Sequence, residues 1–556
     1  MLEGFNPNTI KDLEGAREAI LRLVNLVESQ KAQVDQLQAE NQDLRDENNR
    51  LKGEQGQPDI KPKKKKKKSP SGSSDYSSEK ERRKPKRRRK QSKNDKIKID
   101  RERVLDVEAD ILPEDAEFKG YNDVVVQDIK IETDNVRFRK KKYHSPSEGQ
   151  TYTAPLPLGY EGQFGPMIKS WIIVLYFAMN VTEPKIVAFL QTVGIFISSG
   201  KVSDIIHSET GQMYDEKTEI YEAGLRSTVW QQTDDTGLRV NGQNCYTHIV
   251  CNPFYTVYFT KPRKDRLTVL KILWGDRPLS FCLNELAFAY WEHCGLSKSK
   301  REALSHLPPQ QMLTQAEFET FLKEHGPRLG PQQYKWVLEG AAIAAYHSQD
   351  EFPIVLLLLC DDARQFKRIT EILALCWVHE GRHYKKLNPA LEYHAQILDQ
   401  FLTQFWTFYH QLAAYQLDPT PAEREHLVDE FDQLFSTVTG YQYLDQRIAK
   451  TKAKKEELLP VLDHPEIPLH NNAAELGARQ QKPKQNISFG PRTEEGARIW
   501  DTGLTLVATA YKLGVNIFDY ICDRVSGAYQ MPSLASLIEH KAAQSQLEQT
   551  FLSEPP

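Results

Sequence analysis

Few features of this 556-residue sequence point to secretion or to a membrane. Its seven cysteines are scattered and include no C-x-x-C pair, so a reduced, intracellular protein is expected rather than a disulfide framework. The N-terminal residues show no signal-peptide pattern, and the longest apolar runs, such as 354–360, are too short to span a bilayer. We therefore expect a soluble protein with no membrane partner.

The net charge is almost balanced, at −3, but the positive charge is concentrated in one segment. Between Lys61 and Lys98 there are 19 Lys and Arg and four acids, an excess of 15 positive charges, which leaves the remainder of the chain with an excess of 18 negative charges. Residues 53–100 are of low complexity, so we expect a disordered basic linker that binds DNA phosphates; a solvated tail or a targeting signal is the alternative. The expected DNA contacts are Lys63, Lys64, Lys65, Arg87, Arg88 and Arg89.

Residues 1–52 contain an apolar seven-residue repeat, which is typical of a coiled coil. Five sustained heptads favour a homodimer or higher oligomer, and Asn at two a positions favours a parallel pair in fixed register. A lone amphipathic helix packed on the body is the alternative. The a positions are Ile20, Val27, Val34, Asn41 and Asn48, and the d positions are Leu23, Gln30, Leu37, Leu44 and Leu51.

The remaining sequence alternates between strand and helix patterns. From Thr228, three successive strand patterns lead into a helix, and the run EFPIVLLLLCDD predicts a strand buried on both faces. The segments that we expect are strands over 101–160, a helical DNA-binding region over 161–226, a catalytic domain over 227–522 with helical insertions at about 278–346 and 366–461, and a C-terminal tail over 523–556.

Three acids occupy positions typical of a metal-dependent phosphodiester site. Asp234 ends the first strand after Thr228, Asp361 follows the buried strand, and Glu475 lies in a late helix. Carboxylates from two adjacent strands and a helix are the layout of a ribonuclease-H-like fold, and they suit two Mg²⁺ or Mn²⁺ ions roughly 3.5–4 Å apart. One ion would activate water or a 3′-hydroxyl and the other would stabilise the leaving oxygen, without a covalent protein–DNA intermediate. Taken singly, each acid could instead cap a turn, end a strand or form an ion pair on a helix.

Four motifs then occur in order: TDDTG at 233–237, LCDDARQF at 359–366, CWVHEGRHY at 376–384 and HNNAAELGAR at 470–479. Together they resemble bacterial transposases of the insertion sequence 66 (IS66) family, over roughly Leu112 to Cys522. The resemblance implies a DDE-type DNA transposase with an α/β catalytic core of ribonuclease-H-like fold, which binds transposon ends and carries out hydrolytic strand cleavage and strand transfer.

The resemblance also assigns residues. Asp234, Asp361 and Glu475 match the catalytic acids that hold the metal ions, and His470 stands where the family usually has Asp. The second choices for the site are Asp235, Asp362, His379 and Arg382. The basic residues expected to face DNA after Glu475 are Arg479, Lys482, Lys484 and Arg492.

The sequence departs from the family between the coiled coil and the catalytic part. Family members commonly have paired cysteines there that bind zinc, but 111–126 and 140–152 contain no cysteine. We therefore expect a degenerate zinc-ribbon-like segment over 101–160, and no zinc. Cys376, His379 and His383 could share one helix face but lack a fourth ligand.

Two other functions are compatible with these motifs. One is a catalytically silent descendant that only binds DNA, and the other is a ribonuclease-H-like nuclease that cuts without joining. For the transposase we expect DNA as partner, possible accessory transposition proteins, and a place in the bacterial cytoplasm at the nucleoid.

Overall fold

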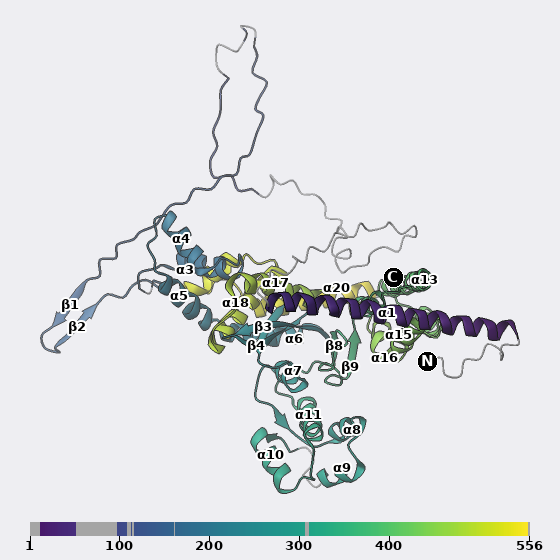
Figure 1. Cartoon of the computed structure of the whole chain (residues 1–556). Coiled ribbons are helices and arrows are strands. Elements are labelled where there is room, and N and C mark those ends of the chain that lie inside the picture. The colour runs from purple at the N-terminus through teal and green to yellow at the C-terminus, as the bar shows by residue number, and fades with distance from the viewer. Residues whose placement is uncertain are drawn as a thin grey trace.

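The computed structural model describes residues 12–51, 97–107, 113, 116–160, 162–305 and 311–553. Figure 1 shows a long N-terminal helix, a central body around one sheet, a helical lobe below the sheet, and arms that stand away from the body. Within the described ranges, no helix is long and apolar enough to cross a membrane. The linker residues expected to bind DNA lie outside these ranges: Lys63, Lys64, Lys65, Arg87, Arg88 and Arg89.

A five-stranded sheet forms the centre of the body, in the order β5, β4, β3, β8, β9. β3, β4 and β5 are antiparallel neighbours, whereas β8 runs parallel to β3 and β9 runs parallel to β8. Asn241 and Gly242 connect β3 to β4 with φ of 49° and 76°, as a tight two-residue hairpin turn requires. The mixed α/β class, the three strands after Thr228 and the buried strand are thereby confirmed. The strands are β3 Trp230–Val240, β4 Gln243–Cys251, β5 Thr256–Lys261, β8 Leu357–Cys360 and β9 Ile372–Leu375.

The short strand β9 corrects the prediction that 366–461 is helical throughout. Its residues pair with β8 from Ile372 opposite Leu357 to Leu375 opposite Cys360. A four-residue apolar run cannot be assigned to strand or helix by its periodicity alone. Here the neighbouring strand decides the conformation.

Helix α18 (Glu494–Leu513) covers the edge strand β5 and satisfies its free backbone groups. Asp501 Oδ2 accepts a hydrogen bond from Thr260 N (2.6 Å), and Thr505 Oγ1 accepts one from Tyr258 N (3.2 Å). Thr509 is one turn further and accepts one from the backbone N of Thr256 (3.3 Å). Polar side chains at every fourth position of one helix therefore close an edge that would otherwise be open to pairing with another chain.

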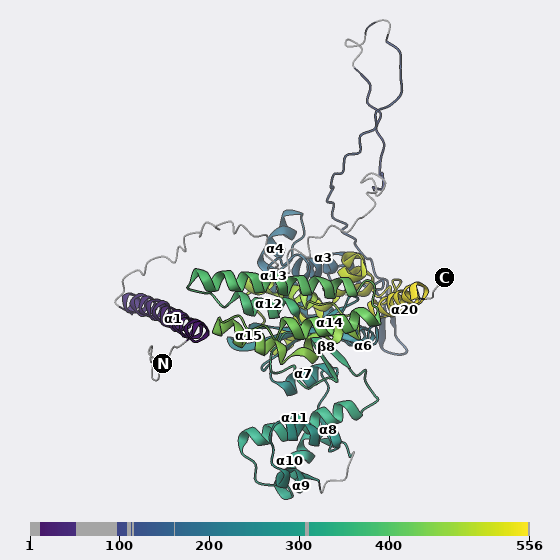
Figure 2. The ribbon, with the colours of Figure 1, turned by 90° about the vertical axis from the view of Figure 1, so that its right-hand side faces the viewer.

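Two groups of helices are inserted around the sheet, one between β5 and β8 and the other after β9. The first forms the lobe below the sheet in Figures 1 and 2, and the second lies beside the sheet. The first group contains α7 Arg266–Leu273, α8 Glu285–His293, α9 Lys298–Leu304, α10 Gln315–Glu324 and α11 Pro331–Ser348, with the short strands β6 Ser280–Phe281 and β7 Leu313–Thr314. The second contains α12 Trp377–Lys385, α13 Glu392–Tyr415, α14 Pro421–Leu434, α15 Gln442–Lys452, α16 Lys455–Leu458 and the 3₁₀ turn η4 Pro460–Leu462.

The second group has an aromatic core around Trp377. The Trp377 ring lies 5.6 Å from the rings of Phe405 and Phe408, and its Nε1 donates to Leu458 O (2.8 Å). Trp377 and Trp500 are both buried. Both side chains are therefore part of the packed interior and are not available to stack on an exposed base.

The helical region predicted over 161–226 is present. It consists of α3 Pro166–Phe177, α4 Glu183–Thr192, α5 Ser199–Gln212 and α6 Tyr214–Arg226. The last helices of the chain are α17 Asn472–Ser488, α19 Ile517–Val525 and α20 Leu534–Ser553. Leu534 and Ile538 are buried where α20 packs against α6, so this part of the expected C-terminal tail belongs to the body.

The segment 101–160 contains fewer strands than predicted. Among its described residues only one hairpin forms, from β1 (Lys142–Ser145) and β2 (Gln150–Thr153). Residues 116–141 contain no strand, although Val124 and Val126, and again Ile129 and Ile131, are two residues apart as apolar residues on one strand face are. These side chains are exposed, so there is no neighbouring strand or core to stabilise the extended backbone as a sheet.

Helix α1 (Leu13–Leu51) packs on the body through the side opposite its apolar repeat. Glu28, 2% exposed, accepts hydrogen bonds from the backbone N atoms of Ala390 and Leu391 and contacts His394 Nδ1 at 3.2 Å. Asn25 donates to Gly440 O (2.8 Å). The apolar repeat stays open, with Ile20 59%, Val34 50% and Leu44 67% exposed. Packing on the body and an open apolar stripe thus coexist, and coiled-coil pairing stays a prediction.

Glu28→Ala should release α1 from the body. The carboxylate binds the two backbone N–H groups that directly precede α13, so its loss leaves both without their partner and should destabilise the docked helix by about 2 kcal/mol. Hydrogen exchange of the α1 amides should become faster. Glu40→Ala is the matched control, because Glu40 lies on the exposed part of the same helix. Equal exchange in both variants would contradict the docking role.

Candidate active site

Asp234 and Asp361 lie side by side on two parallel strands. Parallel pairing runs from Trp230 opposite Leu357 to Gln232 opposite Leu359, and two further residues in the same register lead to Asp234 and Asp361. Neighbouring strands are about 4.8 Å apart, so both carboxyl groups reach one edge of the sheet. Asp361 follows β8 as predicted, but Asp234 lies within β3 rather than at its end, because β3 continues against β4 as far as Val240.

Glu475 is brought to the same place by the start of α17. Asn471 Nδ2 donates to Thr233 O (2.7 Å), and Gln232 Nε2 donates to His470 O (3.3 Å). These bonds attach the N-terminus of α17 to β3 directly before Asp234. Asn471 precedes the helix and makes no side-chain cap bond, so the alternative of a capping box from Asn472 to Glu475 is not observed.

Charge and burial make Asp234 hard to ionise. Its pKa is raised to about 7, mainly by burial and in smaller part by the charges of Asp361, Asp235 and Glu475, against a hydrogen bond from Asp235 N (2.8 Å) that lowers it. Burial also raises the pKa of Asp361, again opposed by a backbone hydrogen bond, from Ala363 N (3.2 Å). The carboxylates are therefore close enough to repel one another.

Glu475 lies next to two arginines and a histidine. Its Oε1 lies 3.3 Å from Arg382 Nη1 and 3.6 Å from His379 Nε2, and its Oε2 lies 3.7 Å from Arg479 Nη2. Burial, followed by the charge of Arg382, lowers the pKa of His379. Arg382 Nη1 is also 2.8 Å from His379 Nε2, which fits a neutral imidazole that accepts from the guanidinium. The second-choice residues His379 and Arg382 thus contact one of the first-choice acids.

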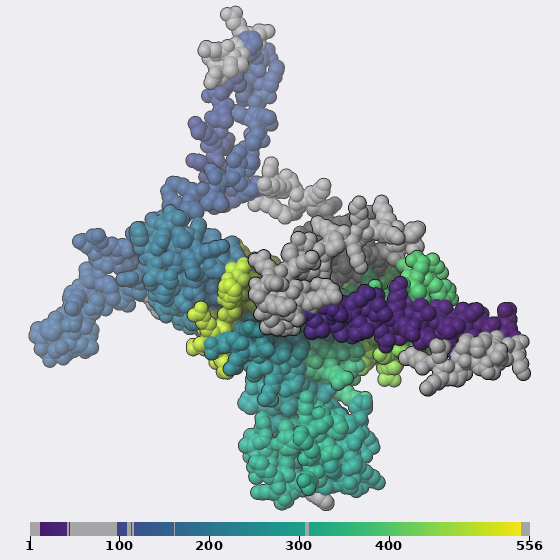
Figure 3. All heavy atoms as spheres, in the orientation of Figure 1, coloured from purple at the N-terminus to yellow at the C-terminus, as the bar shows by residue number. Residues whose placement is uncertain are grey.

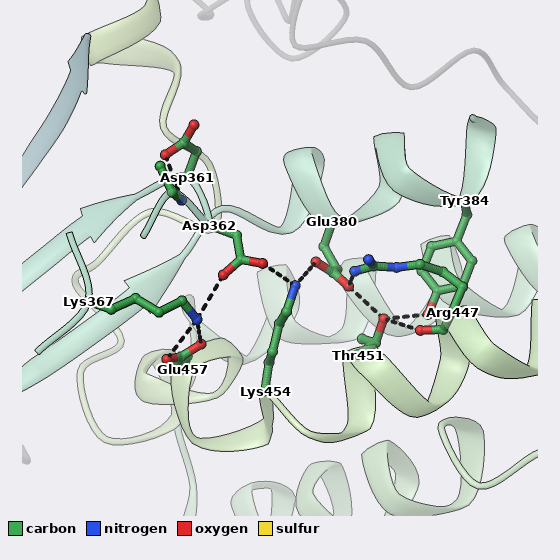
Figure 4. A network of polar contacts seen from close by, with 10 residues as sticks. Asp361, Asp362, Lys367, Glu380, Tyr384, Arg447, Thr451, Lys454 and Glu457 are labelled. Carbon is green, nitrogen blue, oxygen red and sulfur yellow. Dashed lines mark hydrogen bonds and ion pairs between the residues drawn. The ribbon is translucent and has the colours of Figure 1, made fainter. Parts of the chain in front are cut away.

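The two neighbouring aspartates have cationic partners of their own. Asp235 pairs with Lys264 (3.0 Å) and accepts from Gln365 Nε2 (2.8 Å). Asp362 pairs with Lys367 (2.8 Å) and with Lys454 (2.5 Å). Although burial opposes it, hydrogen bonds from these two lysines hold the pKa of Asp362 below its usual value. In Figure 4 the Asp362 side chain points into this network and that of Asp361 points away from it.

The acids fit a hard divalent cation in their chemistry. Asp234 and Asp361 are largely buried carboxylates without a cationic partner among the described ion pairs, and Glu475 Oε1 is buried without a hydrogen bond. Oxygen ligands of this kind are those that Mg²⁺ and Mn²⁺ prefer. Across the described ranges, no three His, Cys, Asp or Glu side chains are gathered to hold an ion as they stand, and Glu475 is paired with cations instead.

The basic residues after Glu475 divide into two kinds. Arg479 and Arg492 are exposed, and Lys482 is half-buried and donates to Gly237 O (2.6 Å). Lys484 is fully buried: its Nζ lies 3.2 Å from the centre of the Tyr176 ring and 5.3 Å from that of Trp500. This placement argues against the predicted contact of Lys484 with DNA. Burial lowers its pKa to about 7, and α17 continues past it to Ser488.

Several residues near the site carried no signal in the sequence. Lys264, Gln365 and Lys454 are separated from their aspartate partners by between 29 and 130 positions of the chain. A sequence shows a nearby charge only along the same helix or strand, so these pairings depend on the fold. Cys376 was considered as a zinc ligand, but its Sγ accepts from Asn471 N (3.3 Å) and its role here is to position the start of α17.

Asp234→Asn should change the pH dependence of stability. Because the pKa of the folded carboxyl is above its unfolded value of 3.8, ionisation costs the folded state free energy, and this cost grows from about pH 4 to pH 7. The variant lacks that cost. Without divalent ions, its free energy of unfolding relative to the wild type should rise by roughly 1–2 kcal/mol between pH 5 and pH 8, below the full linkage value because water reaches the group.

Asp362→Asn is the control with the opposite sign. The pKa of Asp362 is lowered in the fold, so its carboxylate contributes stability above its unfolded pKa and loses it as the pH falls. This variant should be less stable than the wild type at pH 8. Urea unfolding at the two pH values measures both changes, and the same sign in both variants would contradict the assignment of the two environments.

The sheet and these acids define a class of protein: an α/β protein with one acid on a central strand, a second directly after the parallel neighbouring strand, and a third in a late helix whose start is bound to the first strand. Comparison with known proteins is consistent with this. Residues 342–499 match the family described as the IS66 family of transposases. The uncharacterized protein y4jO of Sinorhizobium fredii is 31% identical over 321 residues, which are 58% of this chain and 99% of that protein.

The chain belongs to the IS66 transposase family. Residues 342–499 include Asp361, Glu475 and the helix with His379 and Arg382, whereas Asp234 lies before them. Membership implies transposase activity with DNA as the partner, and transposases of the DDE type generally use divalent metal ions.

Proposed function

We propose that this transposase cuts DNA at the ends of an insertion sequence and joins these ends to target DNA, with Asp234, Asp361 and Glu475 as its catalytic acids. The observation that carries the proposal is the convergence of these three carboxylates from β3, the end of β8 and the first turn of α17. The strand order and directions of the sheet support a ribonuclease-H-like catalytic core.

Asp234, Asp361 and Glu475 would hold the two divalent ions. When bound there, such ions supply activation of the attacking oxygen and stabilisation of the leaving oxygen in a displacement at phosphorus. The protein itself orients the acids. Asn471 fixes α17 to β3, and Arg382 and His379 hold the Glu475 carboxylate until an ion competes for it.

Positive charge beside the acids supports DNA as the substrate. Arg479 is exposed and lies 3.7 Å from Glu475, where phosphates near the scissile bond would be attracted to it. Arg492 is also exposed, but it follows Pro491, whose O accepts a hydrogen bond from Asn241 N at the β3–β4 turn (3.2 Å). Lys264 is paired with Asp235 and would limit repulsion of the DNA by that carboxylate. For the segments before the body we propose pairing through α1 and sequence-independent DNA binding through the basic linker.

The test is an assay of the full-length protein with labelled transposon-end DNA and Mg²⁺, scoring nicked and joined products. Joined products support the transposase proposal. Cleavage without joining would favour a ribonuclease-H-like nuclease, and DNA binding without any product would favour a silent descendant. EDTA should stop both reactions and should leave DNA binding intact.

A further inference from the structure

The hairpin β1–β2 stands away from the body, as Figures 1 and 3 show. Its strands pair antiparallel, with Lys142 opposite Thr153 and Tyr143 opposite Tyr152. Seven of its eight strand residues are exposed, and Tyr143 and Tyr152 expose 64% and 48% of their surface. A two-stranded ribbon without a packed face is not stabilised by a core of its own, so its exposed side chains are available to a partner.

Positive charge is concentrated at the base of this hairpin. Five of the six residues from Arg137 to Lys142 are Arg or Lys, and Glu148 is the one acid between 137 and 154. None of the five basic side chains forms an ion pair with another described residue. By contrast, Lys119 and Lys130, earlier in the same segment, pair with Glu117 (2.5 Å) and with Glu132. The charge beside the hairpin is therefore not neutralised within the described chain.

The base of the hairpin is attached to the body. The Phe138 ring lies 5.3 Å from that of Tyr160, edge to face. Gly159, with φ of +80°, lies so close to the backbone of Ser526 that a Cβ would come within 2.8 Å of Ser526 O. This contact fixes where the arm leaves the body, next to the end of α19.

We infer that the β1–β2 hairpin, with the basic run 137–142, is a DNA-binding arm that takes duplex DNA as its partner. The inference rests on the proposed function, which supplies DNA as substrate. It adds the hairpin and its basic run to the surfaces proposed above to bind DNA. A two-stranded antiparallel ribbon has the width to enter a major groove, and Arg and Lys at its base would contact the flanking phosphates. Lys142 and His144 alternate with Tyr143 along β1, so one face of the ribbon is polar and the other is aromatic.

The test compares two double variants of the full-length protein. Lys141→Gln/Lys142→Gln removes two charges beside the hairpin, and Lys119→Gln/Lys130→Gln removes two charges that are paired with acids. The dependence of duplex binding on salt, measured by fluorescence anisotropy, should lose about 0.9 from its log–log slope for each phosphate contact removed, or about 2 in the first variant, with about tenfold weaker binding. The second variant should match the wild type.

The outcomes separate this inference from the proposed function. The hairpin inference would be overturned if the two variants showed equal slopes for the salt dependence of duplex binding. It would also be overturned if the wild type bound single strands more tightly than duplex, even if the protein cuts and joins DNA. A wild type that binds duplex without any chemistry would count against the proposed function alone. Failure of the wild type to bind DNA would overturn both. Unchanged thermal unfolding of both variants checks that the fold is intact.

Discussion

Asp361→Asn should reduce strand cleavage and joining by on the order of a thousandfold, whereas Asp362→Asn should keep both within about tenfold of the wild type. The two residues are adjacent, but their surroundings differ. Asp361 faces Asp234 at the sheet edge without a cationic partner among the described ion pairs, and Asp362 is neutralised by Lys367 and Lys454. Only the first carboxylate is available to a divalent cation.

The assay uses labelled transposon-end DNA at saturating Mg²⁺, with DNA affinity measured in parallel. Asp234→Asn and Glu475→Gln should behave like Asp361→Asn, and all three should bind DNA with near wild-type affinity, because none of these acids attracts phosphate. A large loss of cleavage and joining in Asp362→Asn, together with retained activity in Asp361→Asn, would assign the second catalytic role to Asp362 instead of Asp361. Retained cleavage in any of the other variants would remove that residue from the site.

Glu380→Gln should destabilise the protein by about 3 kcal/mol. Glu380 is buried on α12 and binds Arg447, Lys454 (3.1 Å) and the hydroxyl of Thr451 (2.6 Å), as Figure 4 shows. These contacts together hold the pKa of its carboxyl below the usual value, although burial opposes them. Glutamine keeps the shape but removes the charge, so two largely buried cations lose their shared partner, and such losses are costly because the cations cannot regain water.

The matched control is Glu457→Gln at the outer end of the same network. Glu457 is about a third exposed, and its partner Lys367 keeps a second acid, Asp362. This change should cost less than about 1 kcal/mol. Urea unfolding of both variants at pH 7 measures the difference. Similar losses of unfolding free energy in the two variants would show that the buried end of the network contributes no more to stability than the exposed end.

Much of the sheet could be predicted from local patterns. Alternating residues and the Asn241–Gly242 turn indicate the strands β3 and β4, and the apolar run before Asp361 indicates β8, because each signal lies within a few residues of the element it forms. Strand β9 gives no such signal: four apolar residues acquire their conformation from the neighbour β8.

The site was predictable in its acids but not in its cations. Acids at the ends of strand patterns and in ordered motifs can be recognised from the local sequence. Lys454, in contrast, is far from Asp362 in the sequence, and only the folding of the second group of helices brings the two together. Lys484 shows the opposite error, since a lysine beside a candidate site suggests a phosphate contact. Here the Lys484 side chain points from α17 toward the ring of Tyr176 on α3 and is buried there. Because α3 is distant in sequence, the local sequence does not show this orientation.

The two sides of α1 can change independently over evolution. Asn25 and Glu28 hold the helix to its own body, and Ile20, Val27 and Val34 lie on the other side and are exposed. In the pairing through α1 that we propose, substitutions in the apolar stripe would alter which copies recognise each other and leave the attachment to the body unchanged. Related elements in one cell could thus diverge in partner choice without losing the geometry of the catalytic unit, and would stop forming mixed assemblies.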